Sequence, residues 1–195
     1  GSLAGAELVT AVEACVAEAN ALGGPMPIGT AISLAGGALQ KDALAANART
    51  MIDLQDRNPG WRDAGSVITG HALCGRALAL TYIDPAAAVA TAADALRLVD
   101  PVGISHVVVA ALKGMAVAAD RLGESDISTR LLRHSLAIGT FESSYDRQVA
   151  QIFAWSGVDL DGMKPETLSR ADLFATIAEL QERHPVTVVP DQGGA

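Results

Sequence analysis

Aromatic residues, cysteines and basic residues are all scarce in this chain of 195 residues. Only three Phe, two Tyr and two Trp are present. The two cysteines, Cys15 and Cys74, are too few for the disulfide framework of a small secreted protein, and their apolar contexts favour reduced thiols. Lys and Arg number 14 against 22 Asp and Glu, for a net charge of -8. Such a field repels phosphates, so no direct nucleic-acid partner is expected.

Long uninterrupted apolar runs are also missing. No stretch reaches the length of about 18 residues that a membrane span needs, so no membrane association is expected. The most apolar window, 104–119, contains His106 and Lys113. The N-terminus lacks the basic region of a signal peptide, which predicts a cytoplasmic protein. Gly1-Ser2 is typical of residues left by cloning, and we therefore expect the chain to be part of a longer polypeptide.

Alanine is the main compositional bias, with 37 of the 195 residues. Alanine loses no side-chain entropy in a helix, and the β-branched residues form no alternating strand-like runs, so an all-α fold is predicted. Apolar residues recur at three- and four-residue spacing, as in the stripe from Leu8 to Leu22. Val67 and Leu78 are predicted to point inward in the same way. Helices are predicted over 3–22, 27–39, 41–56, 63–83, 85–99, 101–122, 125–139, 145–155 and 165–182.

Acidic and hydroxyl residues precede several of these helices and predict their caps. Asp84-Pro85 combines an N-cap side chain with proline at the first helical position, and Asp100-Pro101 repeats the pattern. Asp63 is predicted to cap the helix over 63–83. Ser125 or Asp126 is predicted to cap the helix over 125–139. Gly123 is expected to end the helix before it.

Three helix pairs, over 27–56, 63–99 and 101–139, superpose with a repeat of about 39 residues. Small and apolar residues then fall in register, and a small residue at a fixed point lets neighbouring helices approach closely. We therefore predict a helical-repeat domain over 3–184, built from stacked antiparallel helix pairs, and a flexible tail over 185–195. The alternative is an irregular helical bundle in which abundant alanines coincide. The residues in register are Gly36, Gly75 and Gly114; Ala38, Ala77 and Ala116; and Leu39, Leu78 and Val117.

The segment 70–101, GHALCGRALALTYIDPAAAVATAADALRLVDP, resembles a tetratricopeptide repeat. It carries the small residues, the inter-helix Asp84-Pro85 and the closing Asp100-Pro101, but it lacks the usual aromatics and is longer than the standard repeat. Together with RLGESDISTRLLRHSL at 121–136, it is similar to the degenerate helical-repeat regions of bacterial, especially actinobacterial, signalling ATPases and transcriptional regulators. The resemblance covers about 63–139 and implies a sensor or interaction arm. It does not extend to the nucleotide-binding or DNA-binding domains of those proteins.

Two short motifs have the spacing of a ligand-binding loop but lack the necessary residues. Gly70 and Gly75 are spaced as in a phosphate-binding loop, yet Arg76 and Ala77 stand where lysine and a hydroxyl are needed, and the segment is predicted to be helical. The segment 159–162, DLDG, has part of a calcium loop without its later oxygen ligands. We interpret the first as helix interior and the second as an acidic turn.

The four histidines form no metal-ligand spacing, but two of them are almost one repeat apart. His71 and His106 are 35 residues apart, so stacking of corresponding helices would bring them close together. Cys74 lies one helical turn after His71, without an orienting group or an oxyanion site. Core packing therefore accounts for Cys74, and a metal or ligand site at the histidines is the less favoured alternative. No residue is assigned as catalytic, cofactor-binding or metal-binding, and no cofactor is expected.

Most of the aromatic residues occur late in the chain. The favoured interpretation is a capping core between the last pair and the final helix, and the alternative is a ligand or peptide pocket. The residues are Phe141, Tyr145, Phe153, Trp155 and Phe174.

These observations favour a non-catalytic domain that binds a protein partner or other domains of its parent polypeptide. An open groove on the stacked first helices would support this interpretation. A small-molecule sensor is the alternative and predicts an enclosed cavity between helices. An enzyme is the least favoured, and it predicts polar groups converging near His71, Cys74 and His106. A homodimer through the helix over 3–22 is also expected, if that helix has lost its own partner.

Overall fold

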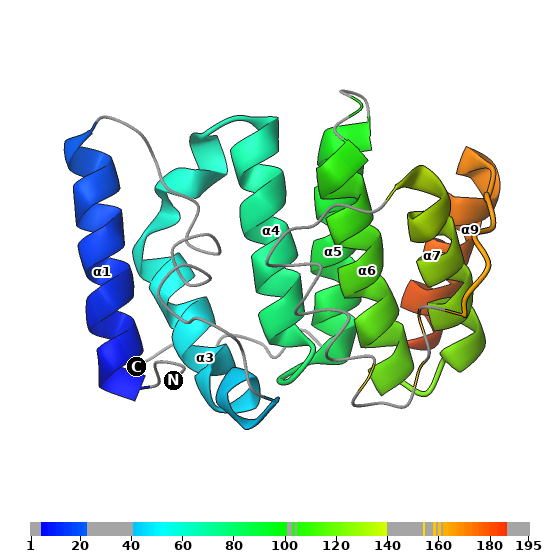
Figure 1. Ribbon diagram of the computed structural model, residues 1–195, viewed down its shortest axis with the longest axis horizontal. Coiled ribbons are helices and arrows are strands. Elements are labelled where there is room, and N and C mark those ends of the chain that lie inside the picture. Colours follow the sequence, from blue (N-terminus) through cyan, green and yellow to red (C-terminus); the bar gives the residue numbers. More distant parts are fainter. Residues whose placement is uncertain are drawn as a thin grey trace, which may run out of the picture.

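A computed structural model describes residues 5–22, 41–100, 103, 105–139, 154, 158, 160 and 162–186. Within these residues the protein is all-α, with no strand (Figure 1). The predicted helices over 27–39 and 145–155 and most of the predicted tail lie outside the described residues. The elements are α1 (Gly5–Ala21), α3 (Lys41–Arg57), the 3-10 helix η1 (Pro59–Asp63), α4 (Ser66–Leu80), α5 (Pro85–Val99), α6 (Ser105–Arg121), α7 (Ser125–Ile138) and α9 (Arg170–Arg183).

Two of the three predicted helix pairs, α4 with α5 and α6 with α7, have the predicted spacing of about 39 residues, and the first helix of the third pair, over 27–39, lies outside the described residues. Their first helices begin at Ser66 and Ser105, and their second helices end at Val99 and Ile138. Both intervals are 39 residues. The helices of each pair pack together, and α4 also packs against α6, so the pairs are stacked along the long axis of the molecule (Figure 1).

The stack continues beyond the two pairs on both sides. On one side α3 packs against α4, and α1 packs against α3. On the other side α9 packs against α5 and α7, so that the second helices of both pairs contact it (Figure 1). The outer face of α1 carries alanine, threonine and acidic residues, including Glu7, Glu13 and Glu18, because Leu8, Val12 and Val16 are buried in the core. The apolar dimer face expected on this helix is therefore not exposed.

Helix α6 is the centre of the core. Every residue from Val107 to Ala119 is buried apart from Val108, which is half-buried. A helix that is buried on all sides is typical of the interior of a protein rather than of its surface. Four alanines of α5, which packs against both α4 and α6, are fully buried as well, in agreement with the prediction that small side chains permit close helix packing. These alanines are Ala88, Ala92, Ala93 and Ala95.

The predicted close approach of helices occurs at Gly70 of α4. A Cβ built on Gly70 would lie 2.8 Å from Val99 Cγ1 and 2.9 Å from Val107 Cγ1. Distances this short do not occur between real carbon atoms, so a side chain at this position would push α4 away from both neighbours. Gly70 therefore fixes how closely α4 lies against the α5–α6 turn. The glycines expected in this role were Gly36, Gly75 and Gly114; Gly75 and Gly114 lie in the interiors of α4 and α6, and Gly36 lies outside the described residues.

The predicted caps are partly right. The Asp84 carboxylate accepts a hydrogen bond from the Ala87 amide at 3.0 Å, and Pro85 follows it, as expected. Gly123 ends α6 with a φ of 83°, and the Glu124 amide donates back to the Ala119 carbonyl at 2.9 Å. This is the hydrogen bond of a Schellman motif, which needs a left-handed residue.

Three predicted caps are wrong. Asp63 is the last residue of the 3-10 helix η1, which was not predicted. The residue that directly precedes α4 is therefore Gly65, with a φ of 85°. Asp100 ends α5, and its carboxylate pairs with Arg170 of the neighbouring helix α9. Glu124 takes the position expected for Ser125 or Asp126, and its side chain makes no cap hydrogen bond because it binds residues of α9 and its C-terminal end.

Two side chains predicted to point inward are exposed. Leu22 follows the last turn of α1 and is 83% exposed, and Val67 in the first turn of α4 is 43% exposed. Leu22 directly follows α1, and Val67 is the second residue of α4, so both lie at a helix end. Leu78, in the middle of the α4 stripe, is buried as expected.

Helix α9 begins at Arg170, five residues later than predicted. The Ser169 hydroxyl accepts a hydrogen bond from the Asp172 amide at 3.1 Å and donates to the Asp172 carboxylate, which fixes the N-terminus here. The residues before it bond to α7 instead of entering the helix. The Glu166 amide donates to the Arg133 carbonyl at 3.1 Å, and the Leu168 amide donates to His134 Nδ1 at 3.1 Å.

Candidate functional site

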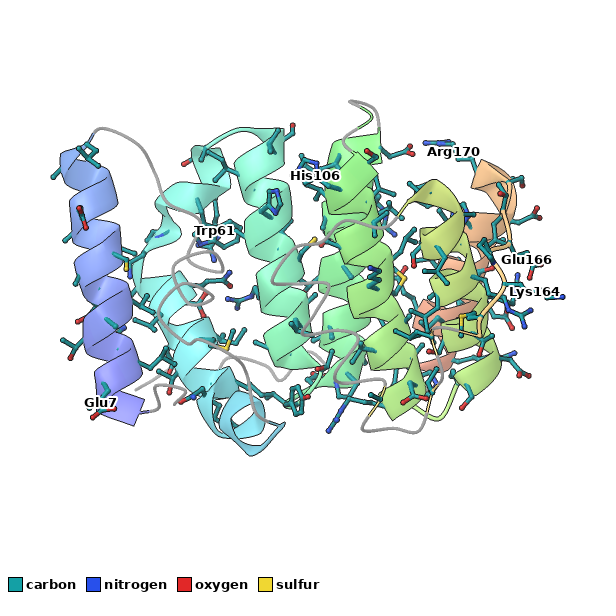
Figure 2. The ribbon with its side chains drawn as sticks, in the orientation of Figure 1. Glu7, Trp61, His106, Lys164, Glu166 and Arg170 are labelled. Carbon is teal, nitrogen blue, oxygen red and sulfur yellow. The ribbon has the colours of Figure 1, made fainter. Side chains whose placement is uncertain are left out.

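Stacking of α4 on α6 brings His71 and His106 into direct contact. Their Nε2 atoms are 3.0 Å apart, and their ring centroids are 4.9 Å apart with the planes tilted by 33°. His71 lies in the second turn of α4. His106 lies in the first turn of α6 (Figure 2), at the edge of the stack where both helices begin (Figure 1). The proximity predicted from the repeat spacing is confirmed.

The two imidazoles differ in their exposure to solvent. His71 is half-buried, and His106 is exposed. Burial lowers the pKa of His71, and the positive charge that His106 acquires on protonation lowers the pKa further. With both rings neutral, one Nε2 donates a hydrogen and the other accepts it. Both effects disfavour a proton on His71 in the folded chain.

Cys74 takes no part in this pair. Its Sγ points into the core and lies 3.8 Å from the Val107 carbonyl, to which it donates. The side chain is 2% exposed, and burial raises the pKa of the thiol to about 12. The thiolate form that nucleophilic catalysis needs is therefore strongly disfavoured. The prediction that Cys74 packs in the core is confirmed, so the convergence of polar groups that an enzyme would require does not include this residue.

The edge that carries the histidines also exposes apolar surface. Val67 lies one turn before His71 on α4, and Ile68 beside it is half-buried. We name Val67, His71 and His106 the α4–α6 edge. The first helix α6 is buried from Val107 to Ala119 apart from the half-buried Val108, and the open groove expected on the first helices stays a prediction. Sequence reasoning found the two histidines of the edge but placed Val67 in the core.

The motif with phosphate-loop spacing lies within α4, as the helical prediction required. In the interior of a helix the amides bond to its own carbonyls, so they cannot hold a phosphate. Arg76 instead forms an ion pair with Asp56 of α3, with distances of 3.0 and 3.3 Å to the two carboxylate oxygens. Asp159 and Asp161 of the acidic turn lie outside the described residues.

Two surface hollows occur near α9, and charged side chains occupy both. The first has a volume of about 270 Å³; there Arg170 Nε donates to Asp100 at 2.9 Å, and the Arg170 guanidinium lies 5.0 Å from the Phe174 ring centroid. Phe174 is thus half-buried beside an ion pair, and the other four aromatics of the predicted late cluster lie outside the described residues. The second hollow, of about 360 Å³, is lined by Gly123, Glu124, Ser125, Asp126, Ile127, Arg130, Glu179 and Arg183.

Sequence reasoning missed the polar contacts that attach α9 to the repeats. His134 holds Leu168 through its Nδ1, and Glu124 holds both Arg183 at 2.8 Å and His184 at 2.9 Å. Glu124 has its pKa lowered, chiefly by the hydrogen bond from His184. The pattern Ser169-x-x-Asp172 is a capping signature that could have located the start of α9. No pattern in the sequence predicts the long-range contacts of His134 and Glu124.

Within the described part of the chain, no three His, Cys, Asp or Glu side chains are grouped so as to hold a metal ion. None of the described helices is long and apolar enough to cross a membrane. Comparison of the chain with protein-family models, with curated proteins and with solved structures gives no match. The resemblance to tetratricopeptide-like regions of bacterial regulators therefore stays a prediction.

Proposed function

We propose that this chain is a non-catalytic protein-interaction or regulatory domain that contacts its partner through the α4–α6 edge. The observation that carries the proposal is the stacking of two helix pairs with a 39-residue period, which is typical of repeat arrays that act through their surfaces. An exposed valine and two adjoining imidazoles at one edge offer a small apolar patch with hydrogen-bonding capacity.

The charge of the chain supports a protein partner rather than a nucleic acid. A net charge of -8 repels phosphate groups and attracts a basic segment. The buried, free Cys74 and the half-buried, free Cys15 are compatible with a reducing compartment, which supports a place in the cytoplasm. By its resemblance, the chain would serve as the interaction arm of a larger bacterial signalling or transcription-regulating protein.

The small-molecule sensor has less support. A ligand pocket is usually concave and mostly apolar, with few polar groups. Both hollows near α9 are open to solvent, and ion-paired residues such as Arg170 and Arg183 line them. An apolar ligand would have to leave these charged groups without their partners, which costs free energy.

Site-specific photocrosslinking in the native host tests the proposal. A photoreactive amino acid is placed at Val67 of the α4–α6 edge and, as a matched control, at the exposed Glu182 of α9. We expect a crosslinked protein, or a second domain of the parent polypeptide, at Val67 and not at Glu182. Mass spectrometry of the adduct identifies the partner.

Two outcomes would contradict the proposal. Crosslinking at Glu182 alone would assign the binding surface to α9 rather than to the edge. No adduct at either position, combined with a metabolite that raises the Tm of the purified chain, would favour the sensor.

A further inference from the structure

The contact between His71 and His106 has the composition and spacing of a metal-binding pair. Imidazole nitrogens are preferred ligands of Zn²⁺, Ni²⁺ and Cu²⁺, whereas Mg²⁺ and Ca²⁺ prefer oxygen ligands. With Zn–N bonds of about 2.0–2.1 Å, two nitrogens lie roughly 3.3–3.4 Å apart at a tetrahedral angle and roughly 2.9 Å apart at a right angle. The observed separation of 3.0 Å lies between these values.

We propose that His71 and His106 form a binding site for a divalent transition-metal ion of the zinc class, with water completing the coordination. Both ligands would bind through Nε2. The ion would sit at the end of the stack and join the first turn of α6 to the second turn of α4. The site uses the two imidazoles of the α4–α6 edge, but it is argued from their geometry and does not require the protein partner proposed above.

Access and rigidity both favour such a site. His106 is exposed, so an ion can enter from solvent and keep its water ligands. The positions of the two rings depend on the contact of Gly70 with Val99 and Val107, which holds the helices together near the pair. A site on two packed helices loses little conformational entropy on binding. Cys74 is excluded as a ligand because its Sγ faces the core.

Metal binding requires one proton to be relocated. With both rings neutral, the hydrogen on one Nε2 occupies the lone-pair position that the ion needs. That ring must lose the hydrogen on Nε2 and gain one on Nδ1. It thereby changes from one neutral tautomer to the other, and the pair releases no net proton. Below the pH at which a ring gains a second proton, protons compete with the ion and binding weakens.

Titration of the tag-free, metal-stripped chain with Zn²⁺ at pH 7.5 tests the proposal. The variants are His71→Gln and His106→Gln, and the matched control is His184→Gln, which removes an imidazole that lies beside Glu124. We expect one equivalent of Zn²⁺ per chain for the unmodified chain and for the control, and loss of this binding in both variants. His106→Gln is the safer variant for folding because the side chain is exposed.

Two further readouts separate ligation from a structural effect. Long-range ¹H–¹⁵N spectra should show Zn²⁺-induced shifts at Nε2 of His71 and His106 and none at His134. At a hundredfold excess of Zn²⁺ over its Kd, the Tm should rise by about 5–10 °C in the unmodified chain and stay constant in His106→Gln. Absence of binding in the folded, unmodified chain would overturn the proposal, as would loss of binding in His184→Gln alone.

Discussion

Gly70 and Val107 lie so close together that a single methyl group on Gly70 would come within 2.9 Å of Val107 Cγ1. This contact joins α4 to α6 and, with them, the two helix pairs of the repeat. It also sets the distance between the histidines at the α4–α6 edge, since His71 directly follows Gly70 and His106 directly precedes Val107. Both proposals above therefore depend on this contact.

Enlarging Gly70 should separate the pairs. Gly70→Val is expected to lower the free energy of unfolding by about 1–3 kcal/mol, because the new side chain overlaps Val99 and Val107 in a close-packed core. Gly60→Val is the control, since a Cβ on the exposed Gly60 meets nothing within 4 Å. Its effect should stay within about 0.5 kcal/mol. Urea unfolding measures both, and equal effects would contradict the contact.

The buried amide of Gln55 should matter more than the exposed ion pair beside it. Gln55 is 2% exposed, and its Nε2 donates to the Ala72 carbonyl of α4 at 2.8 Å. Gln55→Ala removes this bond and leaves a void, which should cost about 1–3 kcal/mol of unfolding free energy. Asp56→Ala removes a partly exposed partner of Arg76 and should cost less than about 1 kcal/mol. The reverse order in urea unfolding would be inconsistent with these contacts.

Acid should destabilise the attachment of α9 through His134. Burial lowers the pKa of His134, so the unfolded chain takes up a proton at this residue at a higher pH than the folded chain does. The stability from this group is thus complete above the unfolded pKa of about 6.5 and is lost as the pH falls below it. Protonation also removes the Nδ1 lone pair that accepts the Leu168 amide.

The variant His134→Asn isolates this effect. Asparagine presents an oxygen near the position of Nδ1 and has no titrating group, so the Leu168 contact can persist. Between pH 7.5 and 5.5 the unfolding free energy should fall less steeply in His134→Asn than in the unmodified chain. Identical slopes would show that His134 is not buried against α9.

Cys74 should resist thiol reagents in the folded protein. Its pKa of about 12 and its burial leave almost no accessible thiolate at pH 8. Alkylation followed by peptide mass spectrometry should show that Cys15, which is half-buried, reacts faster, and that Cys74 reacts only when the protein unfolds. Equal rates under native conditions would contradict the position of Cys74 in the core.

The repeat and the helical class could be predicted from the sequence because they depend on local preferences and periodic small residues. Asp84-Pro85 acts through residues within one turn, and its cap is present. The identical pair Asp100-Pro101 looks the same in sequence, but the Asp100 carboxylate binds Arg170, which is 70 residues away. Such contacts depend on the assembled fold, and the neighbouring residues in the sequence do not predict them.

The candidate site could be predicted only in part, for the same reason. The interval between His71 and His106 indicated their proximity, because residues about one repeat apart occupy corresponding positions on helices that stack against each other. Whether Val67 is covered depends instead on where the neighbouring helices end. Its apolar character was correctly recognised, but its exposure could be learned only from the assembled stack.

The close stacking of α4 on α6 is the claim on which the rest depends, and nuclear Overhauser spectroscopy tests it directly. In a sample with labelled valine methyl groups, we expect strong cross-peaks from the Gly70 α-protons to the γ-methyl groups of Val107 and Val99. If the folded chain shows the helical pattern of α4 and α6 but no cross-peak between Gly70 and Val107, the helices do not lie against each other. The account of the site would then be contradicted.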